Sequence, residues 1–178
     1  MITHILRISE KVLSYPNSIK LFLAINIMSL VFAMIMQYGF DVYPCILCLW
    51  QRVPFGATAV ICLLMLLLKT NAKKAYAVFL FCSLMYMGGM GTAIFHTGVE
   101  RHWWAGTSSC SLLPVKAGSA EDLRQSLLKT VLPPCDEITW DIFGLTIANL
   151  NILASLGMAA LTAAAALQSS RSAKNTQE

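Results

Sequence analysis

Charged side chains are scarce in this chain. Asp, Glu, Lys and Arg make up 12% of its 178 residues and 57% are hydrophobic, whereas about 25% of a soluble domain is charged. This composition excludes an ordinary soluble domain and predicts a membrane protein with the length of one domain. The sequence also lacks a GxGxxG motif and a P-loop, so nothing indicates a soluble nucleotide cofactor.

Four apolar runs are long enough to cross a bilayer, whose core of about 30 Å requires about 20 helical residues. Because backbone groups in lipid must be hydrogen-bonded within the protein, each run is predicted to be a helix. The first run exceeds the roughly 7–15 residues of a signal-peptide core, so we expect it to remain in the mature protein. We therefore predict an all-α membrane protein whose transmembrane domain, residues 19–167, is a four-helix bundle. The runs are residues 19–39, 49–68, 75–95 and 142–167.

Basic residues are distributed unevenly around these runs. The N-terminal flank, the connection after the second run and the C-terminal tail together carry eight basic and two acidic residues, whereas the other side carries four basic and seven acidic ones. Because Lys and Arg accumulate in cytoplasmic segments, we expect residues 1–18 to be a cytoplasmic segment and residues 168–178 a disordered cytoplasmic tail. The long loop 96–141 then lies on the outer side. The basic residues are explained by these flanks, so nucleic-acid binding is not supported.

Six cysteines are present, and four of them fall on the predicted outer side, where disulfides form and persist. Cys45 and Cys48 open the second helix, and Cys110 and Cys135 lie in the long loop. The other two lie inside helices and are expected to pack as small hydrophobic residues. They are Cys62 and Cys82.

Two structural disulfides are one interpretation of the outer cysteines. It suits Cys110 with Cys135, which could staple the loop, but the ring closed by Cys45 and Cys48 is too small to add much stability. CxxC is the spacing of redox dithiols, whose thiols often have lowered pKa values. A zinc site made of all four cysteines is disfavoured, because the second pair is 25 residues apart and the compartment is oxidising. We expect no metal site, and haem attachment would need CxxCH.

The stretch YPCILCLWQR places further chemistry around this dithiol. Pro44 suits the first turn of a helix, where the dipole and the free N–H groups favour a thiolate. Arg52 follows Cys48 by four residues and shares its helix face, so it could hold a thiolate or another anion. The alternative is that Arg52 extends to the lipid headgroups. A reactive dithiol beside a fixed cation at the edge of the lipid suits a quinone as oxidant.

The outer loop contributes two further expectations. Residues 120–132 carry leucine and valine at helical spacing, which predicts a short amphipathic helix lying on the membrane or packed on the bundle, ended by Pro133 and Pro134. His96, at the outer end of the third helix, could donate to a quinone oxygen or relay a proton. The alternative for His96 is an interfacial residue without a functional role.

Three motifs resemble one family, the disulfide bond formation protein B (DsbB) family. They are PCILCLWQR, the run HTGVE followed by WWAG and Cys110, and PPCDEITWDIFGLTIANLN. The likeness covers about residues 19–167 and implies a multi-pass oxidase of the bacterial inner membrane. Such an enzyme reoxidises a periplasmic thioredoxin-fold oxidase, DsbA, and passes two electrons to ubiquinone or menaquinone, which sustains disulfide formation in other proteins. Thr107 stands where the family pattern has proline.

The resemblance also implies roles for individual residues. Cys110 is similar to the cysteine attacked by the reduced partner, and Cys135 to the one that then attacks Cys45. Cys48 is thereby released as the thiolate that faces the quinone, with Arg52 beside it. Exchange finally restores the disulfides Cys45–Cys48 and Cys110–Cys135.

Two alternatives compete with this interpretation. Relatives of vitamin K epoxide reductase also use a four-helix bundle with CxxC, but there the motif is near the end of the last core helix, whereas here it opens the second. The other alternative is a non-catalytic four-span scaffold with two structural disulfides. A scaffold has no need of Arg52 next to Cys48, which argues for the oxidase.

Overall fold

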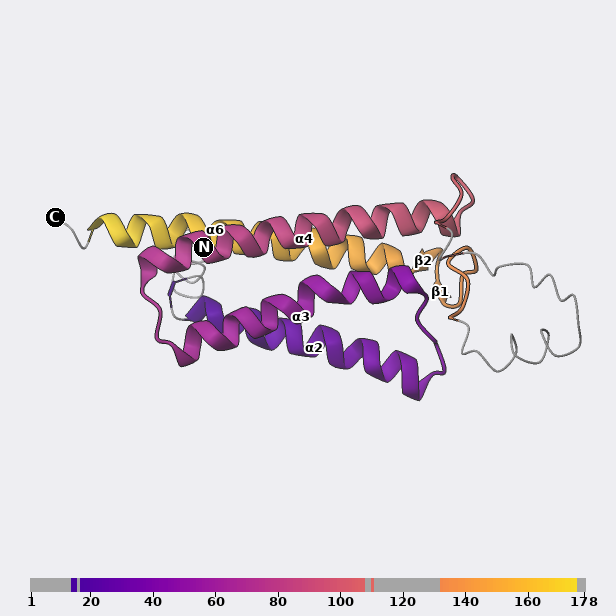
Figure 1. Ribbon diagram of the computed structural model, residues 1–178, viewed down its shortest axis with the longest axis horizontal. Coiled ribbons are helices and arrows are strands. Elements are labelled where there is room, and N and C mark those ends of the chain that lie inside the picture. The colour runs from indigo at the N-terminus through magenta and orange to yellow at the C-terminus, as the bar shows by residue number, and fades with distance from the viewer. Residues whose placement is uncertain (1–13, 16, 108–109, 111–131, 176–178) are drawn as a thin grey trace, which may run out of the picture.

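The computed structural model describes residues 14–15, 17–107, 110 and 132–175. Most of this part of the chain forms four long helices, each long and apolar enough to span a membrane (Figure 1). They confirm the prediction of an all-α, four-helix membrane bundle. The helices are α2 (Asn17–Gly39), α3 (Ile46–Leu67), α4 (Ala72–Glu100) and α6 (Ile147–Asn175).

The helices run alternately between two ends of the bundle (Figure 1). The α2–α3 connection, the C-terminal end of α4 and the start of α6 lie together at one end, with Cys45 and Cys135. We call this the cysteine end. The short α3–α4 turn lies at the opposite end, together with the start of α2 and the end of α6.

Aromatic side chains and buried polar contacts join the helices. α4 packs along α6, while α3 packs against both α2 and α4. Phe22 meets Phe79 edge to face with ring centroids 5.5 Å apart, and Phe55 meets Tyr86 in the same way at 5.4 Å. The Tyr86 hydroxyl donates a 2.7 Å hydrogen bond to Oδ1 of the fully buried Asn26. This bond connects α4 to α2 and satisfies a polar side chain that lipid would not solvate.

The helix ends at the cysteine end differ from the expected ones. α3 begins at Ile46 rather than at residue 49, and Pro54 lies inside it. α4 continues to Glu100, five residues past the expected end, so His96 lies in the last turns of a helix and not in a loop. The helix continues through Gly98, over which the indole ring of Trp104 packs, and the backbone N–H of Arg101 caps it by bonding to the carbonyl of Thr97.

A β-hairpin replaces the expected first turn of the fourth helix. Strands β1 (Asp141–Ile142) and β2 (Leu145–Thr146) pair antiparallel around a two-residue turn. Both turn residues, Phe143 and Gly144, have positive φ (54° and 78°), as the type I′ turn of a tight hairpin requires. The apolar composition of this segment suggested a helix, but α6 begins only at Ile147. There Thr146 and Asn149 cap each other's backbone N–H groups.

The C-terminal tail also differs from its prediction. α6 runs on to Asn175, so residues 168–175 are helical and not disordered. The alanine-rich run and the QSSRSAKN segment contain neither glycine nor proline, so nothing ends the helix at residue 167. The predicted amphipathic helix at residues 120–132 lies, apart from Leu132, outside the described residues.

Gly89 of α4 marks a close approach between three helices. A Cβ atom at this position would lie 2.9 Å from Cγ of Pro54 in α3 and 3.6 Å from Oγ of Ser155 in α6. The neighbouring Gly88 has no heavy atom within 4 Å of the same hypothetical Cβ. Of these two glycines, only Gly89 is therefore needed for close packing of the helices.

We expect Gly89→Ala to destabilise the bundle by about 1–3 kcal/mol, because the added methyl group overpacks the contact with Pro54. Gly88→Ala is the matched control, since it makes the same change one position away in open space. Thermal unfolding of both variants in the same detergent measures the difference. Equal midpoints for the two variants would contradict the close approach of α3 and α4 at this level.

Candidate functional site

The first turn of α3 holds the CxxC pair. Cys45 is the N-cap of α3, and its Sγ accepts a 3.4 Å hydrogen bond from the backbone N–H of Cys48. This confirms the expectation that the pair lies at a helix start. Both residues are present as thiols, Cys45 buried and Cys48 half-buried. The sulfur of Cys45 thus takes the place of the oxygen that usually caps a helix.

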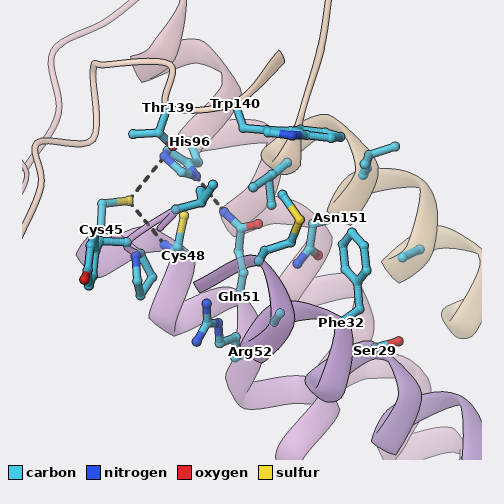
Figure 2. Close-up of a pocket in the computed structure, with 18 of the residues that line it drawn as sticks. Ser29, Phe32, Cys45, Cys48, Gln51, Arg52, His96, Thr139, Trp140 and Asn151 are labelled. Atoms are coloured by element: carbon cyan, nitrogen blue, oxygen red, sulfur yellow. Dashed lines mark hydrogen bonds between the residues drawn. The ribbon is translucent and has the colours of Figure 1, made fainter. Parts of the chain in front are cut away.

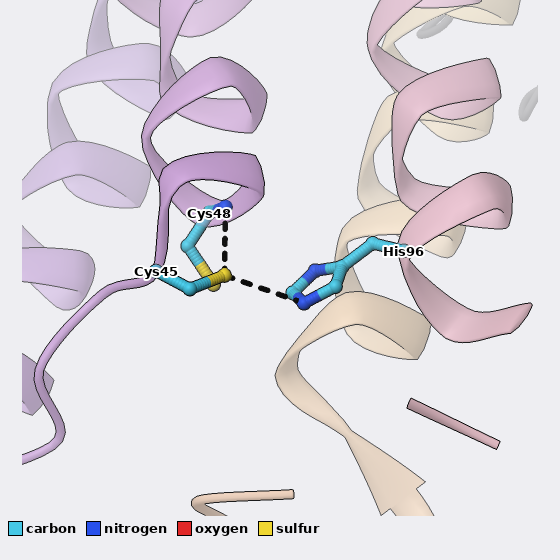
Figure 3. A group of neighbouring side chains, drawn as sticks. All are labelled: Cys45, Cys48 and His96. Atoms are coloured by element: carbon cyan, nitrogen blue, oxygen red, sulfur yellow. Dashed lines mark hydrogen bonds between the residues drawn. The ribbon is translucent and has the colours of Figure 1, made fainter. Parts of the chain in front are cut away.

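His96 joins α4 to this pair. Its Nε2 lies 3.4 Å from Cys45 Sγ, and its Nδ1 lies 2.8 Å from Nε2 of Gln51 in α3 (Figures 2 and 3). A carboxylate oxygen of Glu100, one turn further along α4, lies 3.7 Å from His96 Nε2. The ring is only 3% exposed, so His96 is a buried partner of the dithiol and does not stand alone at an interface.

These contacts favour a negative charge on Cys45. The hydrogen bond from the Cys48 thiol holds the pKa of the Cys45 thiol well below its ordinary value, His96 acts in the same direction, and burial opposes both. In the dithiol form the backbone N–H of Cys48 and the ring of His96 therefore favour Cys45 as the anionic sulfur. The resemblance gave the thiolate role to Cys48, at a different stage of the exchange.

Arg52 lies one turn after Cys48, as its spacing predicted. Its Nη1 donates a 2.8 Å hydrogen bond to Oε1 of Gln37 in α2. The guanidinium is thus held by a neighbouring helix within the bundle. Gln37, Gln51 and Glu100 were not singled out in the sequence, although polar residues inside or at the end of a predicted span are a usable signal.

The second cysteine pair forms a disulfide, Cys110–Cys135, with Cα atoms 4.9 Å apart. Both residues are buried, and they pack in one cluster with Cys45, Leu47 and Val99. The backbone N–H of Cys135 also donates to the carbonyl of Cys110 at 3.1 Å. The structure therefore brings together all four cysteines that the sequence singled out, 45, 48, 110 and 135, from segments far apart in the chain.

Small residues make room for this cluster. A Cβ on Gly106 would lie 2.8 Å from Cβ of Cys110, and one on Gly98 would overlap the indole ring of Trp104. Trp104 in turn donates a 2.9 Å hydrogen bond to the carbonyl of Phe95 and stacks on its ring. The motif HTGVE–WWAG is thus explained by a tryptophan folded back onto the end of α4.

A cavity of about 470 Å³ adjoins the dithiol. Cys45 and Cys48 line it, whereas Cys110 and Cys135 do not. Its walls come from α2, the α2–α3 connection, α3, the end of α4, α6 and the segment before the hairpin, and Figure 2 shows side chains from the four helices and this segment around it. Most lining residues are apolar, and among the polar ones His96 contacts the Cys45 sulfur and Gln51 contacts His96. The cavity can therefore hold a mainly apolar molecule whose polar part faces the dithiol. The polar side chains that line the cavity include Gln51, Arg52, His96, Glu100 and Asn151.

Comparisons with known proteins give a consistent result. The family model described as "Disulfide bond formation protein DsbB" matches residues 17–165. The protein named "Disulfide bond formation protein B" from Xanthomonas oryzae pv. oryzae (strain MAFF 311018) is 30% identical over 148 residues, which are 80% of this chain and 85% of the relative. Its namesake from Xanthomonas axonopodis pv. citri (strain 306) is 32% identical over 135 residues, covering 73% and 77%. No solved structure matches the chain.

In the reduced protein we expect Cys45 to stay a thiolate well below the pKa of a free cysteine, about 8.5. Cys48→Ala removes the strongest hydrogen-bond donor and should raise the titration midpoint. The ultraviolet absorbance of the thiolate measures this, in a background without the loop pair (Cys110→Ser, Cys135→Ser). Cys62→Ala, which removes a thiol of the same helix remote from the site, should leave the midpoint unchanged. A midpoint near that of a free thiol would contradict the assignment.

Proposed function

Because the chain belongs to the DsbB family of membrane disulfide bond formation proteins, we propose that it is a quinone-reducing thiol oxidase. It reoxidises a periplasmic thioredoxin-fold oxidase similar to DsbA and passes the electrons to a membrane quinone. The family implies disulfide oxidoreductase activity. The identity of the partner protein and that of the electron acceptor are what we propose.

The observation that carries the proposal is the packing of a dithiol and a disulfide in one buried cluster. Cys45 contacts the cluster that contains Cys110 and Cys135, and together with Cys48 it also lines the cavity. A purely structural pair of bridges would not require a thiol with a lowered pKa beside a buried histidine. The arrangement supports disulfide exchange between the two pairs.

The exchange proceeds by thiolate attack in series. A thiolate of the reduced partner attacks Cys110, forms a mixed disulfide and releases Cys135. Cys135 attacks Cys45 of the oxidised Cys45–Cys48 pair and releases Cys48. The partner's second thiol then displaces Cys110, which leaves the partner oxidised, and Cys110 attacks Cys135 and releases Cys45. Two electrons and two protons have then moved from the partner to Cys45 and Cys48.

The position of the negative charge changes during this sequence. In the free dithiol it resides on Cys45, which accepts the hydrogen bonds from Cys48 and His96. Once Cys45 is bonded to Cys135 it can no longer carry the charge, and the departing Cys48 does so. Arg52 lies one helical turn from Cys48 and supplies a fixed positive charge at that stage.

The cavity fits a quinone in shape and polarity. Its apolar walls suit a ring with a long hydrocarbon tail, and Arg52 and His96 would hold the polar oxygens close to Cys48. When bound, ubiquinone or menaquinone accepts the two electrons and two protons whose loss restores the Cys45–Cys48 disulfide. Gln37 fixes the Arg52 guanidinium, and Gln51 fixes the His96 ring.

The charge distribution supports an orientation in the bacterial inner membrane. Lys69, Lys74 and Arg171 lie at the end opposite the cysteines, whereas Asp136 and Asp141 lie at the cysteine end. With the basic end in the cytoplasm, both termini are cytoplasmic and the cysteines face the periplasm. The Cys110–Cys135 disulfide is buried, so the partner must displace part of its cover to reach it.

Cys48→Ser should abolish quinone reduction, because the Cys45–Cys48 disulfide can no longer form. The measurement is the ultraviolet absorbance of ubiquinone or menaquinone when the purified protein is supplied with a reduced periplasmic thioredoxin-fold dithiol. Cys62→Ser, on the same helix and away from the site, is the matched control and should keep full activity. Turnover by the Cys48 variant would contradict the electron path. If the wild-type protein shows no turnover and its disulfides are stable, the result would instead indicate a non-catalytic four-span scaffold.

Arg52→Ala should raise the KM for quinone about tenfold or more, since a charge-assisted hydrogen bond contributes about 1.5–3 kcal/mol and about 1.4 kcal/mol is tenfold in affinity. The KM for the partner should change little, because Arg52 lines the cavity and is not part of the cluster around Cys110. Arg171→Ala, an exposed arginine at the opposite end, serves as control. Unchanged quinone dependence in Arg52→Ala would mean that this residue only joins α3 to α2 through Gln37 and does not contact the quinone.

A further inference from the structure

Three metal-ligand atoms converge at the cysteine end. Sγ of Cys45, Sγ of Cys48 and a ring nitrogen of His96 all lie within 4.8 Å of one another (Figure 3). We propose that the reduced dithiol and His96 form a binding site for one Zn²⁺ ion, and that the bound ion withholds the dithiol from oxidation. The claim that the ion withholds the dithiol from oxidation rests on the proposed function, whereas the claim that the site binds Zn²⁺ does not.

The spacing of the atoms is close to what zinc requires. Zn–S bonds of about 2.3 Å and Zn–N bonds of about 2.0–2.1 Å in a tetrahedron separate neighbouring ligand atoms by about 3.5–3.8 Å. The observed distance from Cys45 Sγ to His96 Nε2 is 3.4 Å. All three atoms lie within 4.8 Å of one another, so side-chain adjustments can place an ion among them. Cys₂His with one open position is a known ligand set for zinc.

The ligands are held from two helices before any ion arrives. Cys45 and Cys48 belong to the start of α3, and His96 belongs to α4. Gln51 contacts the far nitrogen of the ring, Nδ1, at 2.8 Å. A ring bound to metal through Nε2 must donate from Nδ1, and rotation of the Gln51 amide offers its oxygen for that bond. Such partners orient metal-binding histidines.

The charge balance also favours a divalent cation at this buried place. Two thiolates and one Zn²⁺ ion are together neutral, so the ion removes the cost of holding negative sulfur away from water. Arg52, the nearby cation, is engaged by Gln37. Cys45, Cys48, His96 and Glu100 all line the cavity, from which water can complete the tetrahedron, and a carboxylate oxygen of Glu100 lies 3.7 Å from His96 Nε2.

Binding is restricted to the reduced state. A Cys45–Cys48 disulfide has no thiolate to offer, whereas the dithiol binds the ion and releases its remaining thiol protons to solvent. No electrons move in this step. The sulfur atoms must leave the ion before they can bond to each other, so zinc binding and reoxidation exclude one another. This site differs from the four-cysteine zinc site that the sequence disfavoured.

The test uses the full chain in detergent, in a background without the loop pair (Cys110→Ser, Cys135→Ser), so that only one redox pair remains. Reduced and oxidised samples are incubated with ZnCl₂, desalted under inert gas and analysed for metal. We expect one Zn²⁺ per chain in the reduced sample and none in the oxidised one. Equal binding by both samples, or binding by neither, would overturn the proposal.

Variants locate the ligands. Gln51→Ala should weaken Zn²⁺ binding about 10–100-fold, as is typical for the partner of a metal-binding histidine, and His96→Ala should weaken it at least as much. A double variant without the two helix-interior cysteines (Cys62→Ser, Cys82→Ser) is the matched control and should bind fully. Unchanged affinity in His96→Ala would reduce the site to a dithiol alone and contradict the proposal. If His96→Ala does not fold, the Zn²⁺ affinity of Gln51→Ala decides whether His96 is a ligand.

Co²⁺ gives an independent measurement, because thiolate ligands produce charge-transfer absorption and a tetrahedral site produces strong visible bands. Both signals should appear with the reduced protein, and the visible bands should change in His96→Ala. Quinone reduction by the wild-type chain in chelator-treated buffer then separates the oxidase hypothesis from the metal-site hypothesis. Quinone turnover by a chain that binds no Zn²⁺ would support the oxidase and contradict the metal site. Zn²⁺ binding by a chain without quinone turnover would support the metal site and contradict the oxidase. If both hold, added Zn²⁺ should inhibit turnover, and the chelator should restore it.

Discussion

The contact between Cys45 and His96 connects the features on which this structure depends. It joins the start of α3 to the end of α4. Such a contact is strongly stabilising in a lipid environment, because polar groups there have no water to bind. The same need pairs Arg52 with Gln37 across α3 and α2, and Tyr86 with Asn26 across α4 and α2. Pairing of polar groups thus both holds the helices in register and builds the site.

Burial gives the two cysteine pairs different surroundings. Cys45 and Cys48 face a cavity with apolar walls, whereas Cys110 and Cys135 lie behind them in the loop region and do not reach it. A molecule in the cavity therefore meets only the first pair. In the proposed function, the partner protein reacts with the second pair. The order of exchange that we propose follows from this separation.

The sequence was sufficient for everything that depends on local composition. The four spans follow from apolar runs, and the position of Cys45 and Cys48 follows from Pro44 and the start of such a run. What could not be predicted depends on contacts between helices. Cys45 and His96 are 51 residues apart, and Gln37 reaches Arg52 only because α2 packs on α3.

The errors at the two ends of the fourth helix have the same physical origin, since hydrophobicity indicates where a chain can be buried but not where its backbone turns. Ile142 and Phe143 are apolar, yet positive φ at Phe143 and Gly144 forms a hairpin. The C-terminal tail is polar, yet a helix already started needs no apolar face to continue past residue 167, because propagation costs less than nucleation. The hairpin matters for the site. It places Thr146 so that its hydroxyl donates a 2.7 Å hydrogen bond to Glu100, which fixes the carboxylate next to His96 and so extends the polar side of the dithiol to α6.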